Sequence, residues 1–118
     1  MDINFAKSFS EEWIQAWNSH DIENIISHYA EELEFKSPLI VERYSDPDGI
    51  IYKRDKLKEY FLIGLTNNPS LTFKLKQVLL GVNCLTLYYQ NARGGETSEL
   101  FEFNESNKVI RSVSCYSF

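Results

Sequence analysis

The chain contains 118 residues, 43% of them hydrophobic and 25% charged, and its formal net charge is −5. This length and apolar content are typical of one globular domain over residues 1–118 and exclude an intrinsically disordered chain. The acidic balance and the lack of a basic stripe argue against a nucleic-acid partner. No run of about 18 apolar residues is present and the first residues lack an apolar signal core, which predicts a cytoplasmic protein without a membrane partner.

Two further classes of chemistry lack support in the sequence. Cys84 and Cys115 do not form a C-x-x-C unit, so we expect free, buried thiols in a reducing compartment. No set of His, Cys or carboxylate residues has metal-ligand spacing, and Gly94-Gly95 is a turn rather than a phosphate-binding loop. We therefore predict no metal and no cofactor.

The N-terminal segment has the pattern of two helices. Aromatic residues recur every four positions from Phe5 to Trp17, which predicts a helix with one buried face. Residues 18–20 end this helix, and Asp21 is a favourable N-cap for a second one. The buried stripe expected on the second helix consists of Ile22, Ile25, Ile26 and Tyr29.

A short strand and a third helix are expected next. Apolar and charged residues alternate from Leu33 to Ser37, and Pro38 ends regular pairing. Residues 39–52 are less regular; they contain a strong Asp-Pro-Asp-Gly turn at 46–49 and a short apolar strand at 50–52. A helix from Arg54 to about residue 66 should follow, stopped at Asn67-Asn68-Pro69.

The rest of the chain has the pattern of strands. Alternation begins at Leu71, is interrupted at Gly81, resumes at Leu85, and continues through turns at 93–96 and 104–107 to a last strand at 109–118. This predicts a four-stranded antiparallel meander. Helices gathered on one face of such a sheet make an α+β layer fold.

Several segments together resemble a known family. They are WNSHD at 17–21, HYAEELEFKSP at 28–38, the turn containing Gly49 and ELFEFNESNKVIRSVSCY at 99–116. With these residues the chain resembles the nuclear transport factor 2-like superfamily, and within it the SnoaL-like group, which is related to polyketide cyclases and ketosteroid isomerases. The resemblance implies a cone-shaped half-barrel, with three helices from the N-terminal half packed on a strongly curved, mainly antiparallel sheet around a pocket.

The resemblance can be compared with the ketosteroid isomerases position by position. Their acidic Tyr falls on Trp13, whose indole donates a hydrogen bond but cannot act as a phenol. Their general base falls on Ser37, and a serine without a partner base does not abstract a proton near neutral pH. Their third residue falls on Glu99, which keeps a carboxyl group. The isomerase reaction is therefore not expected.

Glu99 is the one catalytic candidate, and it has two interpretations. Thr97, Glu99, Phe101 and Phe103 share one face of a predicted strand. On a concave face the Glu99 carboxyl would lose hydration and its pKa would rise, whereas on the rim it would be an ordinary solvated charge. His28 and His20 are interpreted as a helix-edge residue and a residue at the end of a helix, because no catalytic motif surrounds them.

Two functions remain open from the sequence. The first is a protein that binds a small apolar molecule, polyketide-like or steroid-like, with a cryptic acid–base isomerase, cyclase or hydratase activity based on Glu99. The second is a non-catalytic dimerisation or protein-interaction module. The expected ligand-binding residues are aromatic or hydroxyl-bearing; they are Trp13, Trp17, Tyr29, Phe35, Ser37, Phe101, Ser112, Ser114 and Tyr116.

Both faces of the predicted meander carry apolar residues. We assign Leu75, Leu85, Leu87 and Val113 to one face and Val78, Leu80, Tyr88 and Ile110 to the other. Helices can cover one face only, and a second apolar face usually marks an interface. This pattern predicts a homodimer formed through the sheet, which the family resemblance also implies.

Overall fold

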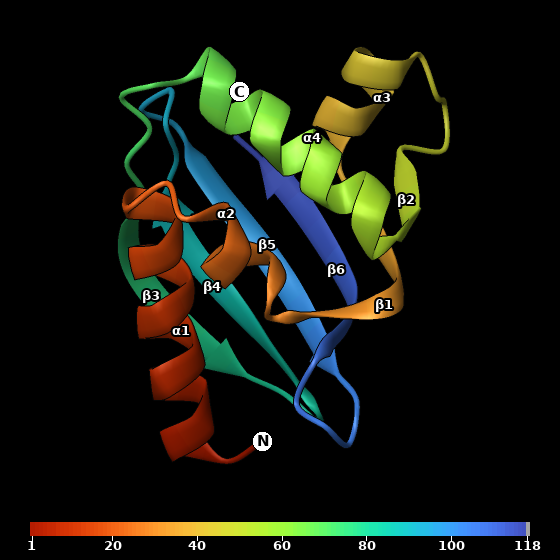
Figure 1. The fold of residues 1–118 in the computed structure, drawn as a ribbon. Helices are drawn as coiled ribbons and strands as arrows, with labels where there is room; N and C mark the ends of the chain where they lie inside the picture. The colour runs from red at the N-terminus through yellow and green to blue at the C-terminus, as the bar shows by residue number, and fades with distance from the viewer. Residues whose placement is uncertain (118) are drawn as a thin grey trace.

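The computed structural model describes residues 1–117, in which four helices pack on a six-stranded open sheet. Three of the helices lie on the same side of the sheet and α3 lies at one end of it (Figure 1). None of the helices within residues 1–117 is long and apolar enough to cross a membrane. The elements are α1 (Ile3–Asn18), α2 (Ile22–Ile26), β1 (Tyr29–Lys36), α3 (Pro38–Tyr44), β2 (Ile50–Lys53), α4 (Arg54–Asn67), β3 (Lys74–Leu80), β4 (Cys84–Gln90), β5 (Glu96–Phe103) and β6 (Val109–Tyr116).

The strand order in the sheet is β2-β1-β6-β5-β4-β3. All neighbouring strands run antiparallel except β1 and β6, which are parallel. The predicted meander of β3 to β6 is confirmed, and β1 and β2 extend it beyond β6. The α+β fold class with helices on one face of a mainly antiparallel sheet is therefore confirmed.

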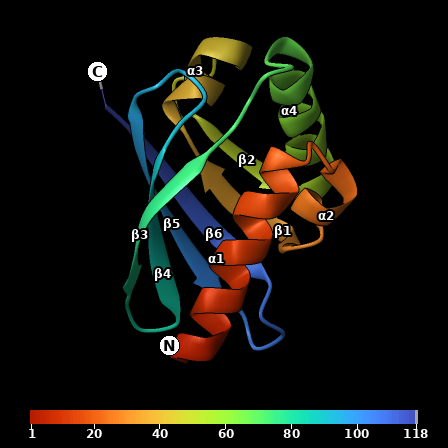
Figure 2. The same ribbon diagram turned by 90° about the vertical axis from the view of Figure 1, so that its left-hand side faces the viewer.

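Helix α1 follows its predicted pattern. The Asp2 side chain caps it by accepting the backbone N–H groups of Asn4 and Phe5. Ala6, Phe9, Ser10, Trp13, Ala16 and Trp17 form its buried face. Figure 2 shows α1 lying along the length of the sheet beside β3, so this helix supplies one wall of the interior.

The region after α1 differs from prediction in one respect. Helix α2 is only five residues long, and Tyr29 is the first residue of β1 rather than part of the helical stripe. His28 lies in the turn between them. Burial explains why Tyr29 belongs to β1. From this strand its side chain is fully buried, and its hydroxyl accepts a hydrogen bond from Trp13 Nε1 at 3.0 Å.

Helix α3 was missed by the sequence reasoning. Its N-cap is Ser37, whose hydroxyl accepts the Leu39 backbone N–H at 3.2 Å, and Pro38 occupies the first turn, where a missing N–H costs nothing. At its other end, the Tyr44 hydroxyl donates to Glu59 on α4 at 3.2 Å. Lys56 of α4 lies over the Tyr44 ring, 4.1 Å from its centroid. These contacts fix α3 against α4.

The predicted assignment of residues to the two sheet faces is partly wrong. A bulge at Lys76 inserts an extra residue in β3, so that Val78 and Leu80 pair with Leu87 and Leu85 and share their inner face. On β6 the serines face inward, and Val113 pairs with Leu100 on the outer face. The hydrophobic alternation predicted the wrong faces here, because it reveals neither the bulge in β3 nor the inward-facing serines of β6.

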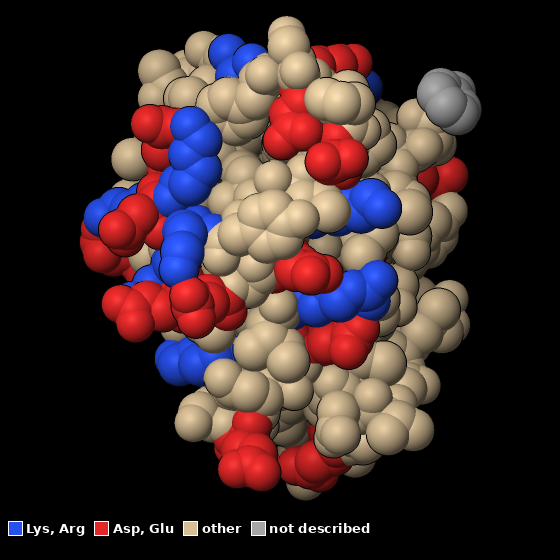
Figure 3. Space-filling model, turned by 90° about the vertical axis from the view of Figure 1, so that its right-hand side faces the viewer, with Lys and Arg blue, Asp and Glu red and all other residues tan. Residues whose placement is uncertain are grey.

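The outer face of the sheet is mixed in character. Its middle row crosses four strands through Leu79, Thr86, Leu100 and Val113. On the side of the molecule that carries β1 and β2, cations and anions are interspersed (Figure 3). Arg111 pairs there with Glu102 at 2.6 Å and lies 3.9 Å from Glu34.

Candidate functional site

A pocket of 460 Å³ opens between the helices and the inner face of the sheet. Figures 1 and 2 both place α3, the C-terminal end of α4 and the β4–β5 turn at the same end of the molecule, and all three contribute to the pocket wall. The lining residues are Trp13, Trp17, Phe35, Leu39, Glu42, Arg43, Tyr60, Phe61, Ile63, Gly64, Asn67, Asn68, Leu71, Phe73, Tyr89, Asn91, Ala92, Arg93, Glu99 and Tyr116.

Glu99 lies in the interior part of this wall. Its position on β5 points it to the inner face, where it is only 3% exposed. Burial raises the pKa of Glu99 from 4.5 to about 7, because the charged form loses its hydration. The groups that oppose this rise are hydroxyls; none of them is a cation. A carboxyl group in this state titrates near neutral pH.

Three hydroxyl groups surround the Glu99 carboxyl. Tyr89 donates to Glu99 Oε1 at 2.9 Å. Ser114 stands directly opposite Glu99 on β6, and Ser112 lies two residues earlier on the same face. Both serine hydroxyls are close enough to lower the pKa of Glu99, but neither forms a hydrogen bond of regular geometry among residues 1–117. The carboxyl therefore has one firm partner and two adaptable ones.

More tyrosines gather around this carboxyl. Burial raises the pKa of Tyr60 to about 12 and also raises the pKa of Tyr116, and the Glu99 charge contributes to both increases. Tyr29 and Tyr89 are buried beside Glu99, and their pKa values lie well above the ordinary value for the same reasons. These phenols stay protonated at neutral pH and can serve as hydrogen-bond donors.

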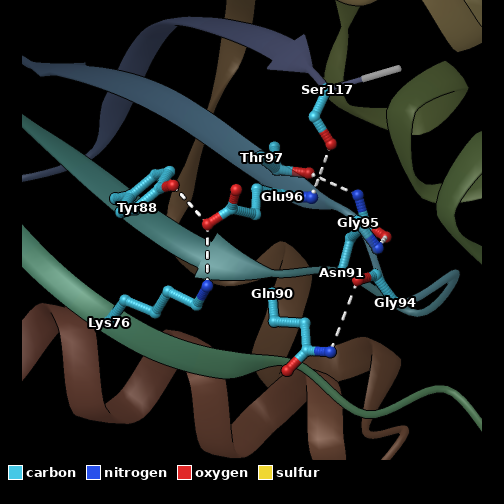
Figure 4. Close-up of polar contacts among 9 residues, drawn as sticks. All are labelled: Lys76, Tyr88, Gln90, Asn91, Gly94, Gly95, Glu96, Thr97 and Ser117. Carbon is cyan, nitrogen blue, oxygen red and sulfur yellow. Dashed lines mark hydrogen bonds and ion pairs between the residues drawn. The ribbon is translucent and has the colours of Figure 1, made fainter.

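The mouth of the pocket carries charge. Glu42 and Arg43 on α3 and Arg93 in the β4–β5 turn are exposed residues of the wall. The Asn91 side chain organises that turn by accepting the backbone N–H groups of Arg93 at 3.0 Å and Gly95 at 3.2 Å. Figure 4 shows Asn91 also donating to the Thr97 hydroxyl. The backbone N–H of the adjacent Glu96 donates to the Ser117 hydroxyl.

A second segment of the wall is tied to α1. The Asn18 side chain makes two hydrogen bonds with the Phe73 backbone, at 2.7 and 3.0 Å. His20, which has a positive φ of 56°, makes a 2.9 Å hydrogen bond through Nε2 to the Leu71 carbonyl. His20 thus holds a pocket loop as well as ending its helix.

The residues expected to bind a ligand fall into two groups. Trp13, Trp17, Phe35, Glu99 and Tyr116 line the pocket. The other five are buried in the layer behind the lining and do not themselves line it: Tyr29, Ser37, Phe101, Ser112 and Ser114. Ligand binding by either group stays a prediction.

Sequence reasoning missed residues from loops and from helix ends. Arg43 was missed because α3 was not predicted, and Arg93 because the turn was interpreted only as a connection. Tyr89 was assigned to a strand but not linked to Glu99. The signal for Tyr89 was available: in an antiparallel pair, β4 and β5 bring Leu87 opposite Glu99, which places Tyr89 one diagonal step away.

Other candidates lie away from the pocket. His28 packs edge-on against Phe9 with a centroid distance of 5.2 Å, and burial lowers its pKa. Both cysteines are free, but Cys115 is exposed and Cys84 is half-buried, so the expectation of buried thiols is wrong. Within residues 1–117, no three His, Cys, Asp or Glu side chains gather as metal ligands would.

Comparison with solved structures identifies the family. A SnoaL-like protein of unknown function from Burkholderia thailandensis shares 34% sequence identity with this chain, over 99% of this chain and 98% of that one, with a TM-score of 0.97. The chain belongs to the SnoaL-like family. No family model matches the sequence, and no curated protein matches it.

More distant SnoaL-like and nuclear transport factor 2-like structures share the fold alone. A candidate isomerase of the SnoaL-like family from Agrobacterium tumefaciens is 13% identical over 98% of this chain and 100% of that one, with a TM-score of 0.77. A nuclear transport factor 2-like protein of unknown function from Cytophaga hutchinsonii is 12% identical over 95% and 89%, with a TM-score of 0.72. The resemblance drawn from the sequence is therefore confirmed at the level of the family.

Proposed function

We propose that this SnoaL-like protein binds a small, predominantly apolar molecule whose oxygen atom forms a hydrogen bond with Glu99. The observation that supports this most strongly is a buried carboxyl group in the wall of an aromatic pocket. A pocket of 460 Å³ lies in the size range of small-molecule sites. Its interior wall includes Trp13, Trp17 and Phe61, which offer apolar surface to a ligand.

The protonation state of Glu99 defines the polar part of the ligand. With a pKa of about 7, the carboxyl is a mixture of both forms at neutral pH. The neutral form donates a hydrogen bond to a carbonyl oxygen, and the ionised form accepts one from a hydroxyl group. The ligand is therefore an apolar molecule with a carbonyl or hydroxyl group, a class that includes polyketide-like and steroid-like compounds.

A substitution at Gly64 tests the pocket directly. Gly64 lines the pocket from α4, and a Cβ added there meets no atom within 4 Å. Gly64→Leu should therefore fold, since leucine also favours a helix, and its side chain should occupy ligand space. Thr66→Leu is the matched control, because Thr66 is an exposed residue of the same helix outside this pocket wall.

The experiment is native mass spectrometry of each protein as purified from cells. A co-purified small molecule present in the wild type and in Thr66→Leu but absent from Gly64→Leu is the expected result. A small molecule retained equally by all three proteins would place binding elsewhere and contradict the proposal. The absence of any bound molecule from the wild type, together with no binding of apolar carbonyl compounds added in vitro, would also contradict it.

Acid–base catalysis is a second candidate, favoured by the near-neutral pKa of Glu99. Glu99 would move a proton on the bound ligand in an isomerisation, cyclisation or hydration. Ser37 does not replace the missing isomerase base, because its hydroxyl already caps α3. The wall offers no second carboxyl beside Glu99 within residues 1–117, and Glu42 is at the mouth. Binding is therefore the function that the geometry supports better.

We also infer that the chain forms a homodimer through the outer face of the sheet. The row of Leu79, Leu100 and Val113 on that face supports this arrangement, because no helix within residues 1–117 covers it. Sedimentation at micromolar concentration should give a dimer, and Val113→Glu should give a monomer. A monomeric wild type at that concentration would contradict the inference.

A further inference from the structure

The mouth and the interior of the pocket differ in charge. Arg43 and Arg93 come from different elements and are both exposed in the wall. Within residues 1–117, neither arginine side chain forms an ion pair. Two arginines at one opening are notable in a chain with a net charge of −5, since the rest of the charge repels anions.

Both arginines are carried by segments that are held in place. Helix α3, which carries Arg43, is fixed to α4 by the contacts of Tyr44 with Glu59 and Lys56. The turn that carries Arg93 is organised by the Asn91 side chain. Both arginines belong to the wall of the same pocket, where the charge of Arg43 opposes the rise in the pKa of Tyr60 and that of Arg93 opposes the rise in the pKa of Tyr116. The two cations therefore flank the same opening.

The interior is less favourable to an anion than the mouth. Its polar centre is the Glu99 carboxyl, which would repel a second carboxylate when ionised. The rest of the wall carries aromatic and aliphatic residues with some tyrosine hydroxyls and asparagine amides, and its cations within residues 1–117 are confined to Arg43 and Arg93 at the mouth. An anionic group of a ligand is therefore stabilised best at the mouth, with the apolar part of the ligand directed into the interior.

We propose that the natural ligand is an amphipathic carboxylic acid, which lies with its carboxylate between Arg43 and Arg93 and its apolar body directed toward Glu99. This inference rests on the proposed function of the same pocket. The arginine guanidinium matches a carboxylate with two parallel hydrogen bonds, which gives direction as well as charge. Glu42 on the same rim reduces the positive potential but leaves the mouth with two cations to one anion.

A matched pair of probes tests this proposal. The probes are 2-naphthoate and 2-naphthamide, which have nearly the same shape and differ in charge. Isothermal titration calorimetry should show the carboxylate binding the wild type about tenfold more tightly than the amide, as expected for a charge-assisted hydrogen bond at a partly exposed site. The preference should decrease as the salt concentration rises.

Variants at the mouth then locate the effect. The double variant Arg43→Gln with Arg93→Gln should lose the preference for the carboxylate, because carboxylate affinity falls more than amide affinity. Arg43→Lys with Arg93→Lys should keep part of the preference, and Glu42→Gln should increase it. Lys7→Gln, which removes an exposed cation of α1 outside the pocket wall, is the control and should change nothing.

The outcomes separate this inference from the proposed function. If both probes bind equally and Gly64→Leu abolishes binding, the pocket binds apolar molecules and the inference about the carboxylate is overturned. A carboxylate preference that survives the double Arg→Gln substitution would overturn it as well. If neither probe binds the wild type, this inference is overturned, while the proposed function is judged separately by the native mass spectrometry of the wild type, Gly64→Leu and Thr66→Leu.

Discussion

Two glutamates of strand β5 lie three residues apart and have opposite environments. Glu99 faces inward, is buried among tyrosines and serines, and has a pKa raised to about 7 by the loss of hydration. Glu96 faces outward, where Lys76 donates to it at 2.7 Å and Tyr88 donates as well (Figure 4). The Lys76 hydrogen bond, helped by Tyr88, lowers the pKa of Glu96.

The difference shows what each face of the sheet can do. On the outer face a carboxylate has a cation and water, so it stays ionised and only ties strands β3, β4 and β5 together. On the inner face the same chemical group loses its hydration, and its hydroxyl partners only partly offset that loss, so its proton is held more tightly. The face of β5 that a glutamate occupies, and not the residue type alone, thus decides whether it exchanges a proton near neutral pH.

The largest expected effect is on stability, when adjacent residues on opposite faces of β5 are replaced by alanine. Phe101 is fully buried and packs edge-on against Trp13 and Phe9, with centroid distances of 5.3 and 5.0 Å. Phe101→Ala should lower the free energy of unfolding by about 4 kcal/mol, because it leaves a cavity in the core. Leu100→Ala on the outer face should cost about 1 kcal/mol when both variants are measured in the monomeric Val113→Glu background. Urea denaturation of the two variants measures both values, and equal losses would contradict the assignment of faces.

The next effect is on the pH dependence of stability. The native pKa of Glu99 is about 7 against an ordinary value of 4.5, so the native state binds the proton more tightly than the unfolded state. The resulting stabilisation is fully present below pH 4.5 and is lost as the pH rises through 7. At about 1.4 kcal/mol for each pKa unit, the loss amounts to about 3 kcal/mol.

Glu99→Gln should remove this contribution, so that its stability changes less between pH 5 and pH 8 than that of the wild type. Glu96→Gln is the matched control on the other face. Because the pKa of Glu96 is lowered, its contribution is present above the ordinary pKa and is lost only as the pH falls through the native one. Urea denaturation series from pH 4 to pH 8 distinguish the two, and a wild-type slope retained in Glu99→Gln would exclude Glu99 as its source.

A smaller effect concerns the hydrogen bond between Tyr89 and Glu99. Tyr89→Phe removes the donor that favours the charged carboxylate, so the pKa of Glu99 should rise by about 1. Tyr88→Phe removes the corresponding donor on the outer face and should leave the pKa of Glu99 unchanged. Titration of the Glu99 carboxyl by NMR in each variant measures the effect. A fall in the pKa of Glu99 in Tyr89→Phe would contradict this arrangement.

Much of the fold could be predicted from periodic patterns. The four-residue repeat of aromatics located α1, and strict alternation located β5 and put Glu99 on the same face as Thr97, Phe101 and Phe103, while the structure shows that this face is the inner one. Both patterns are strong because each element buries one face along its whole length. The family resemblance located the overall arrangement of helices and sheet.

The remaining features depend on contacts that no local pattern records. Helix α3 is short and begins at Pro38, which the sequence reasoning took only as the end of a strand. The bulge at Lys76 changes the face of every later residue in β3, and a single extra residue leaves no mark in composition. The mouth residues Arg43 and Arg93 belong to one pocket wall only because the fold places α3 and the β4–β5 turn at the same end of the molecule.

The most direct test of this account is the titration of the Glu99 carboxyl carbon by NMR in the wild-type protein, with Glu99→Gln used to assign the resonance. The account predicts a midpoint near pH 7 for Glu99, while Glu96 in the same spectra titrates below its ordinary value. A Glu99 midpoint at or below 4.5 would mean that the carboxyl is hydrated and ionised at neutral pH. That result would contradict the central claim that this face of β5 holds a proton-exchanging group in the pocket.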